Sequence, residues 1–379
     1  MELWDTLRLK SNDPQARCKA VENLAARGHV RAVELIVKTL ADEDAQVRRA
    51  AVKSLERMPD EQSVEALMFA AQDDSGEVRE AAATALGQMG DPAAAGPLAF
   101  LLNDPKDAVR MSAGAALKHL GWTPSTREEQ AAFDVATGNA RGAALVGNAA
   151  VKALVTDLKH DTSFKRRAAA EALQEVSDPR ALKPLLVAVG DEDPTVRVSA
   201  IHALSRHPEG AITPTLLRLL RDKDACVRLA TAQVLSRRDD ASVAQDFLNL
   251  LTDPNFEVRI TAVQFLGRIR DARIADALLP MLGDADNDVR QHTAKALGEV
   301  GSAKAIGALV MALIDEERAV RQAAEAALEQ IDRHWIQTDA AQQAIYRLEV
   351  SLEDRPAWVR ASVTQVLAKI RGAHPGTPA

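Results

Sequence analysis

Residues 191–204 read DEDPTVRVSAIHAL and residues 284–297 read DADNDVRQHTAKAL, so an aspartate, an arginine and a leucine recur at the same spacing. An arginine followed by a leucine seven residues later occurs eleven times in the chain. The arginines are Arg17, Arg48, Arg79, Arg110, Arg166, Arg197, Arg228, Arg259, Arg290, Arg321 and Arg360. Successive arginines lie 31 residues apart, except for steps of 56 and 39 residues that contain one period plus an insertion. A fixed period in this range is typical of stacked-repeat solenoids.

Each period contains two apolar stripes with helical spacing. The first stripe lies twelve and eight residues before the arginine, and the second lies one residue before it and three, six and seven residues after it. In the copy at Arg259 these residues are Phe247 and Leu251, then Val258, Ala262, Phe265 and Leu266. Such spacing places apolar side chains on one face of a helix. The pattern predicts an all-α fold of about eleven repeats, each with a first helix (A) and an antiparallel second helix (B).

Proline and glycine mark the predicted ends of the B helices. Asp-Pro dipeptides at 13–14, 104–105, 193–194 and 253–254 place a capping carboxylate before a proline, so each predicts a B-helix start. Glycine stands eleven residues after the arginine at Gly28, Gly90, Gly121 and Gly301, where the B helix is expected to end.

An aspartate precedes the arginine by six residues in nine of the eleven copies. These residues are Asp42, Asp73, Asp104, Asp191, Asp222, Asp253, Asp284, Asp315 and Asp354. Carboxylates near cations can serve in catalysis, but a pair that recurs in nearly every repeat indicates a stacking device. We expect each aspartate to bond the arginine or a backbone N–H of the neighbouring repeat.

The runs at 191–204 and 284–298 resemble the HEAT repeat, in particular the short bacterial type named after phycobilisome lyases. The resemblance covers nearly the whole chain. It implies a right-handed α-α superhelix, a HEAT-repeat solenoid with a 31-residue period, whose B helices line the concave side. About eleven helix pairs stacked at roughly 10 Å would form an arc on the order of 100 Å long.

The insertions define the expected domain organisation. Residues 1–120 are predicted to form N-terminal repeats, and 121–147 a helical insertion, with a helix near Arg127–Ala136, that splices the stack. Central repeats are expected over 148–332. The last repeat, with its eight-residue insertion and Trp335, is expected to cap the array over 333–371, and 372–379 to form a disordered tail.

Composition restricts the classes of partner. The net charge of −7 disfavours nucleic acid and anionic membranes, and aromatic residues, at 3%, are too few to stack bases. Two distant cysteines, no apolar run that could span a bilayer and an N-terminus unlike a signal peptide lead us to expect a cytoplasmic protein. A capped stack is compatible with a monomer.

The sequence contains no recognisable active site, metal site or cofactor site. HEAT-type deoxyhypusine hydroxylases bind iron through repeated His-Glu dipeptides, and none of the eight histidines here precedes a glutamate. The H-E-x-x-H, C-x-x-C, G-x-S-x-G and G-K-[ST] motifs are also missing. The leading hypothesis is a non-catalytic scaffold for a protein or peptide. The alternative is an enzyme or enzyme subunit related to phycobilin lyases, or one with a family-level oxidoreductase association.

Three consecutive repeats suggest where a partner binds. Val198, Leu229 and Ile260 directly follow their arginines, at a position that is polar or small in most other repeats. The residues five and nine after the arginines in these repeats are His202, Gln233 and Gln264, then Arg206, Arg237 and Arg268. Residues 196–274 carry twelve Lys or Arg against nine Asp or Glu. An apolar strip edged with arginines would suit an acidic or amphipathic peptide, whereas ordinary packing between the repeats is the alternative interpretation.

Overall fold

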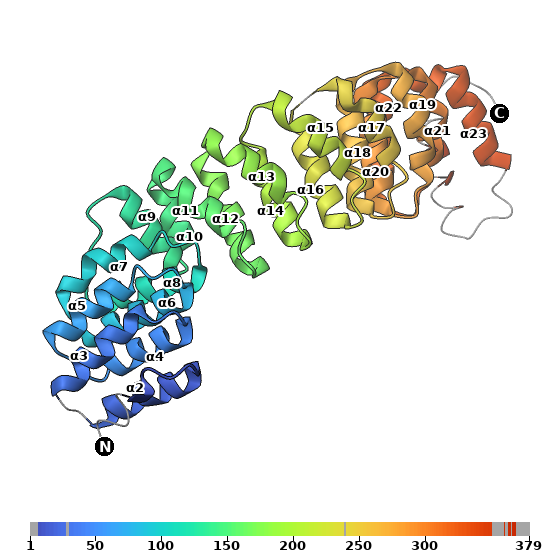
Figure 1. The fold of residues 1–379 in the computed structure, drawn as a ribbon. Helices are drawn as coiled ribbons and strands as arrows, with labels where there is room; N and C mark the ends of the chain where they lie inside the picture. Colours follow the sequence, from blue (N-terminus) through green and yellow to red (C-terminus); the bar gives the residue numbers. More distant parts are fainter. Residues whose placement is uncertain are drawn as a thin grey trace. The chain divides into compact units, whose positions relative to one another are not determined.

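The computed structural model describes residues 7–27, 30–238, 240–350, 360, 363–364 and 366–368. Over these residues the chain forms α-helices and short 3-10 helices, with no β-strand (Figure 1). The prediction of an all-α fold is therefore confirmed. The helices form two compact units, unit 1 (Met1–His207) and unit 2 (Pro208–Ala379), and each is described by itself.

Unit 1 consists of a layer of A helices and a layer of B helices. Its B helices are α2 (Pro14–Arg27), α4 (Ala45–Leu55), α6 (Gly76–Met89), α8 (Asp107–His119), α12 (Ser163–Val176) and α14 (Pro194–Leu204). Its A helices are α3 (Val30–Lys38), α5 (Glu61–Ala70), α7 (Ala95–Leu101), α11 (Val151–Asp157) and α13 (Leu182–Ala188). The insertion contributes α9 (Arg127–Ala136), which spans the residues predicted to be helical, and α10 (Ala140–Leu145). Neighbouring B helices pack on one another except α8 and α12, between which α9 and α10 provide the contacts, and each A helix packs on the B helix that follows it.

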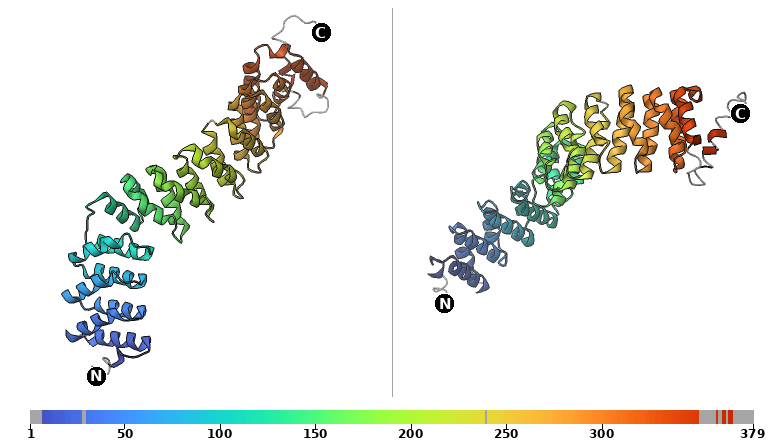
Figure 2. Two further views of the ribbon diagram at one scale, coloured as in Figure 1. Left: turned by 45° about the horizontal axis from the view of Figure 1, so that its top comes forward. Right: turned by 90° about the vertical axis from the view of Figure 1, so that its right-hand side faces the viewer.

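Unit 2 has the same two layers. Its B helices are α16 (Ala225–Ser236), α18 (Phe256–Ile269), α20 (Asn287–Val300) and α22 (Arg318–Ile331). Its A helices are α15 (Glu209–Leu219), α17 (Ala244–Leu250), α19 (Ala272–Leu278), α21 (Ile306–Ala312) and α23 (Asp339–Val350). The helices of this unit, yellow to red, stand side by side in the right-hand view of Figure 2.

Short 3-10 helices begin or extend many A helices. They are η1 (Thr39–Ala41), η2 (Pro92–Ala94), η3 (Gly147–Ala150), η4 (Pro179–Ala181), η5 (Ala241–Val243), η6 (Leu279–Gly283), η7 (Ala303–Ala305) and η8 (Trp335–Gln337). Trp335 is buried, and α23 begins two residues after η8 ends. Most of the predicted last repeat and the whole predicted tail lie outside the described residues.

The two apolar stripes meet between the layers. The leucine seven residues after the repeat arginine is buried in all eleven copies, from Leu24 to Leu367. In the repeat at Arg259, Phe247 of the A helix packs on Phe265 of the B helix with their ring centroids 4.0 Å apart. Each repeat therefore buries its apolar surface against its own helices and the adjacent repeat, which is the stabilising contact in a solenoid.

The repeat arginines and aspartates form a ladder of ion pairs, as expected of a stacking device. Within each unit, the guanidinium of one repeat contacts the aspartate of the next repeat at 2.6–2.8 Å. The pairs are Arg17–Asp42, Arg48–Asp73, Arg79–Asp104, Arg166–Asp191, Arg228–Asp253, Arg259–Asp284 and Arg290–Asp315. The same arginine donates to the backbone carbonyl six residues before it, as Arg259 does to Asp253 O at 2.8 Å. The arginine side chain thus holds the loop of its own repeat and also binds the aspartate of the following repeat.

Two of the four Asp-Pro helix starts were predicted wrongly. The dipeptides at 13–14 and 193–194 do begin α2 and α14, and Asp193 accepts a hydrogen bond from Thr195 N. By contrast, α8 begins at Asp107 after Lys106, and α18 begins at Phe256 after Asn255. Asp104 and Asp253 instead lie six residues before their arginines and belong to the ladder. The same dipeptide occurs in two registers of the repeat, and only one register starts a helix.

Glycines end the B helices as predicted where the structure describes them. Gly90 and Gly301 are C-caps with φ values of 72° and 71°, and Gly121 has φ 64° in the turn after α8. Gly28 lies outside the described residues. Ser177 and Arg270 occupy the same register without being glycine, and they have φ values of 48° and 55°. This left-handed conformation is costly for residues with a Cβ.

Candidate protein-binding surface

The candidate binding surface is the B face, which we define as the side of the B helices that carries residues one, five and nine after the repeat arginine. Val198, Leu229 and Ile260 are half-buried at the first of these positions. They therefore contribute to packing between helices as well as to the surface. Val198 lies on α14 of unit 1, whereas Leu229 and Ile260 lie on α16 and α18 of unit 2.

The predicted polar residues are more accessible than the apolar strip. His202 and Gln233 are half-buried and Gln264 is exposed. Arg206, Arg237 and Arg268 are all exposed. Within unit 2, Arg268 donates through Nη2 to the backbone oxygen of Ser236, the last residue of α16, at 2.5 Å. This contact holds the Arg268 guanidinium beside the end of the neighbouring B helix.

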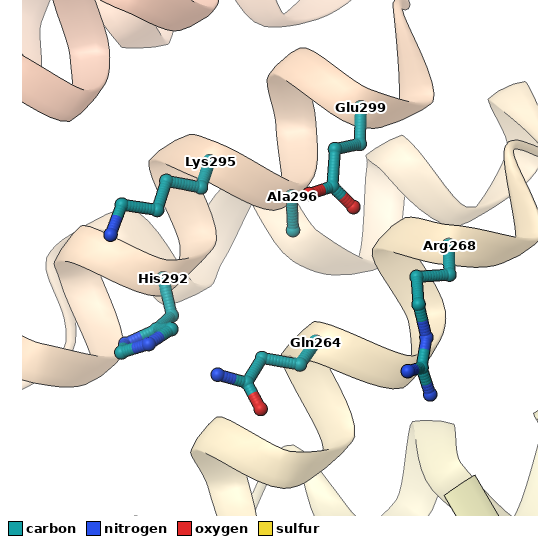
Figure 3. A pocket seen from close by; sticks show the side chains of 6 residues that line it. All are labelled: Gln264, Arg268, His292, Lys295, Ala296 and Glu299. Carbon is teal, nitrogen blue, oxygen red and sulfur yellow. The ribbon is translucent and has the colours of Figure 1, made fainter. Parts of the chain in front are cut away.

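A hollow of about 340 Å³ lies on the B face between α18 and α20 (Figure 3). It is lined by Gln264, Arg268, His292, Lys295, Ala296 and Glu299. Two of these residues, Gln264 and Arg268, belong to the predicted site. The others were missed because the apolar strip ends at Ile260, although Lys295 and Glu299 stand five and nine residues after Arg290. Carrying the same register forward by one repeat would have identified them.

The close approach of α18 and α20 forms the floor of this hollow. Gly267 of α18 faces Ala296 of α20, and a Cβ built on Gly267 would lie only 2.7 Å from the Ala296 Cβ. The Glu299 carboxylate lies over this contact, with Oε2 3.4 Å from the same Cβ position. The next pair, Gly298 and Ala327, repeats the arrangement between α20 and α22. Small residues at these positions bring the helix backbones together and leave longer side chains to form the walls.

The walls carry more positive than negative charge. Arg268 and Lys295 supply two cations against the single carboxylate of Glu299. His292 Nδ1 lies 2.8 Å from the backbone oxygen of Asp288, so Nδ1 must carry the proton of this contact. The Nε2 atom of a neutral His292 is then available as an acceptor. The hollow can therefore present cationic donors, an amide and an imidazole to a polar ligand.

The described part of the chain offers neither a metal site nor a membrane-spanning helix. Among those residues, no group of three or more histidine, cysteine, aspartate or glutamate side chains could hold a metal ion. None of the helices described there has the length and apolar character required to cross a bilayer.

The fold and the B face define a protein built from stacked helical repeats. A family model for HEAT repeats matches seven overlapping segments of the chain: 6–74, 40–118, 69–134, 128–205, 149–236, 182–253 and 244–329. These matches cover most of the sequence, and the chain belongs to the HEAT-repeat family. A search of curated proteins found no match.

Several solved structures resemble the chain. An engineered protein is 23% identical, with 87% of this chain and 98% of that protein covered and a TM-score of 0.39. Escherichia coli YibA is 17% identical, with 86% and 98% covered and a TM-score of 0.42. Kap95p, solved bound to RanGDP, is 14% identical, with 98% and 61% covered and a TM-score of 0.42. These identities are too low to indicate more than the fold.

Proposed function

We propose that this HEAT-repeat chain is a non-catalytic scaffold that binds a protein or peptide partner on its B face. The observation that carries the proposal is the hollow between α18 and α20, which is concave, accessible and lined by polar side chains from two successive repeats. HEAT repeats present long surfaces of this kind, and residues that differ between repeats give such a surface its specificity.

The charge of the hollow favours an acidic or amphipathic segment as the partner. Arg268 and Lys295 line the hollow, and Arg237 is exposed on the preceding B helix of unit 2. Cations at the edge of an interface attract an acidic partner and raise the rate of association. Leu229 and Ile260, half-buried on the same face of unit 2, would contribute apolar contact area. Val198, His202 and Arg206, at the same repeat positions in unit 1, are proposed to contact the partner there.

The proposal includes finer points that rest on the sequence. The repeats are of the phycobilisome-lyase-like type, and the protein is a bacterial, cytoplasmic monomer organised as repeats over 1–120 and 148–332, with a splice at 121–147. The alternative is an enzyme or enzyme subunit related to phycobilin lyases. That alternative predicts a bound chromophore or metal in the purified protein, whereas the scaffold predicts neither.

Charge reversal in the hollow tests the scaffold. We would compare the wild type with the double variant Arg268→Glu, Lys295→Glu as baits in a pull-down from the native host, followed by mass spectrometry. The matched control is Arg127→Glu, Arg141→Glu, which changes net charge equally at two exposed sites of unit 1. We expect one partner to be lost by the hollow variant and kept by the control.

The purified complex then gives a quantitative readout. Association should weaken as salt increases, and the hollow variant should flatten this dependence. A partner that binds the hollow variant and the wild type equally would place the binding surface elsewhere. A visible absorption band or a stoichiometric metal in the purified wild type would favour the enzyme.

A further inference from the structure

The large apolar side chains that are exposed share one register of the repeat. Among the described residues, five of the ten such side chains stand ten residues before a repeat arginine. They are Leu7, Phe69, Phe100, Val187 and Val350. This position lies on the A helix, on the opposite layer from the B face. The register is visible when the repeats are aligned on their arginines.

Helix geometry explains why these side chains are exposed. The core positions of the A helix are twelve and eight residues before the arginine, as Leu98 and Leu102 are before Arg110. Each residue turns a helix by about 100°. The position ten residues before the arginine, two residues from each core position, therefore lies on roughly the opposite side of the helix from the core. A polar residue is expected there, and Lys38 and Asn249 stand at this position in other repeats. Packing within the chain therefore does not require phenylalanine at this position.

Phe69 on α5 and Phe100 on α7 are neighbours in this register, and both belong to unit 1. Their side chains are 70% and 76% exposed, and the chain has only seven phenylalanines. A hollow of about 200 Å³ lies beside Phe100 and is lined by Ala71, Gln72, Pro97 and Phe100. Two exposed aromatic rings on successive A helices, one of which lines a hollow, form an apolar surface of the kind that marks an interaction site.

The two helices that carry the rings hold charge of one sign, and Lys38, in the same register on the adjacent α3, is paired with Glu34 at 2.9 Å. The only ionisable side chains on α5 and α7 are Glu61 and Glu65, and both are exposed. Glu65 lies four residues before Phe69 and therefore on the same side of α5. On α7 the equivalent position is Gly96, where an added Cβ would meet no atom within 4 Å. The rings are thus bordered by a carboxylate on one helix and open space on the other.

We propose that Phe69, Phe100 and the adjoining hollow bind a basic amphipathic helix of a partner protein. Packed helices are separated by about 8–10 Å, and a helix advances roughly 10.5 Å in seven residues. A partner helix that runs along the stack can therefore place apolar residues seven positions apart on the two rings. A lysine or arginine on its edge would pair with Glu65. This surface is independent of the B face, and its failure would leave the scaffold proposal intact.

Two peptide probes test the proposal with the full-length protein. Each is a fluorescein-labelled helix of about 17 residues with the same leucine stripe, and the polar positions are lysine in one and glutamate in the other. Fluorescence anisotropy at physiological salt measures their affinity for the wild type. We expect the lysine peptide to bind at least about tenfold more tightly than the glutamate peptide.

Variants locate the binding. We expect Phe69→Ser, Phe100→Ser to weaken binding of the lysine peptide by at least about tenfold, and Glu65→Lys to remove the preference for lysine over glutamate. Leu145→Ser is the matched control, because Leu145 is 86% exposed on α10 and lies outside the surface. Circular dichroism checks that all variants remain folded. We expect this result because every substituted side chain is exposed.

Two results would overturn the inference. One is failure of the lysine peptide to bind, or equal binding by the wild type and the double serine variant. The other is self-association of the wild type, seen by light scattering as a mass that rises with concentration and is lost in the double serine variant. That result would assign the surface to a second copy of the chain.

Discussion

Replacing Gly267 by alanine should separate α18 from α20. The new Cβ would lie 2.7 Å from the Ala296 Cβ and 2.9 Å from the Ala296 Cα. Non-bonded carbon atoms prefer separations of about 3.5–4.0 Å, so the two helices must move apart by roughly 1 Å. The atoms in the way include backbone, which cannot rotate aside as a long side chain would.

Two effects of opposite sign determine the change in stability. Inserting a methyl group into a well-packed contact costs about 1–3 kcal/mol, and the backbone contact places this site towards the upper end. Alanine is preferred to glycine inside a helix by about 1 kcal/mol. The free energy of unfolding should therefore decrease by about 1–2 kcal/mol. The hollow above the contact should change shape, and binding on the B face should weaken with it.

Urea-induced unfolding followed by circular dichroism measures the loss. Because stacked repeats can unfold in parts, hydrogen exchange of the α18 and α20 amides should accompany the global measurement. Gly96→Ala is the control, since no atom lies within 4 Å of its Cβ position, and it should be neutral or slightly stabilising. The double variant Gly267→Ala, Ala296→Gly should recover space and show a coupling energy of about 1–2 kcal/mol.

A Gly267→Ala protein as stable as the wild type would refute this reasoning. It would show that the helices adjust without loss and that the glycine is not required for their approach. A double variant whose effects simply add would lead to the same conclusion, because it would locate the loss outside the contact between the two residues.

Three further predictions concern stability. Leu266→Ala should lower the free energy of unfolding by about 2–5 kcal/mol, because Leu266 is fully buried, and hydrogen exchange should show the loss concentrated in unit 2; unchanged protection there would contradict it. Burial alone would raise the pKa of Asp284, but hydrogen bonds from Arg259 and from Asp286 N, with the guanidinium charge, lower it. Since the folded pKa lies below the unfolded value of about 3.9, this stabilisation is full above that value and is lost as the pH falls through the folded pKa. An acid titration by circular dichroism should therefore show a shallower loss in Asp284→Asn than in the wild type, and identical profiles would count against the ladder. Arg270→Gly should raise stability by about 1 kcal/mol, because it relieves a left-handed residue at φ 55°, whereas Gly301→Ala should lower it; thermal unfolding of both variants gives the signs.

The periodic part of the fold could be predicted from sequence because each repeat satisfies the same local requirements. A buried leucine recurs in every copy and an aspartate six residues before the arginine in nine of eleven, whereas a glycine ends the B helix in only some copies. Because the same pattern recurs in many copies, the sequence predicts the repeat fold strongly. The helix starts at Asp104 and Asp253 were mistaken because one dipeptide serves in two registers. Only the position of the arginine distinguishes the two.

The candidate site was less predictable, since a surface is defined by which residues differ from the repeat and by how deeply they lie. The helical spacing predicts that Gln264 and Arg268 share one side of a B helix, and both line the hollow, but the burial of Ile260 depends on its neighbours. The hollow itself depends on Gly267 and Ala296, which allow two helices to approach. Such a pairing between consecutive repeats is not visible from one repeat alone.

The insertion shows which requirement of the repeat is fundamental. The repeat at Arg166 has His160 where others have the ladder aspartate. His160 Nδ1 accepts from Thr162 N at 2.9 Å, so it replaces the cap that an aspartate supplies, and Nε2 lies 2.7 Å from an oxygen of Asp107. A neutral imidazole cannot pair with Arg110, which instead contacts Asp157 at 2.9 Å, across the insertion.

The ladder of ion pairs therefore continues past the insertion because a carboxylate at a different position pairs with Arg110. Arg110 is buried, and a buried guanidinium without a carboxylate would be strongly destabilising. When His160 occupies the usual site, Asp157 and Asp107 supply the negative charge, and Lys165 balances Asp107 at 2.8 Å. Counting six residues back from each arginine finds an aspartate in nine of eleven copies, and the copy at Arg166 is one of the two exceptions. Because the buried Arg110 needs a carboxylate, a substitute is expected near His160, and Asp157, the last residue of α11, supplies it.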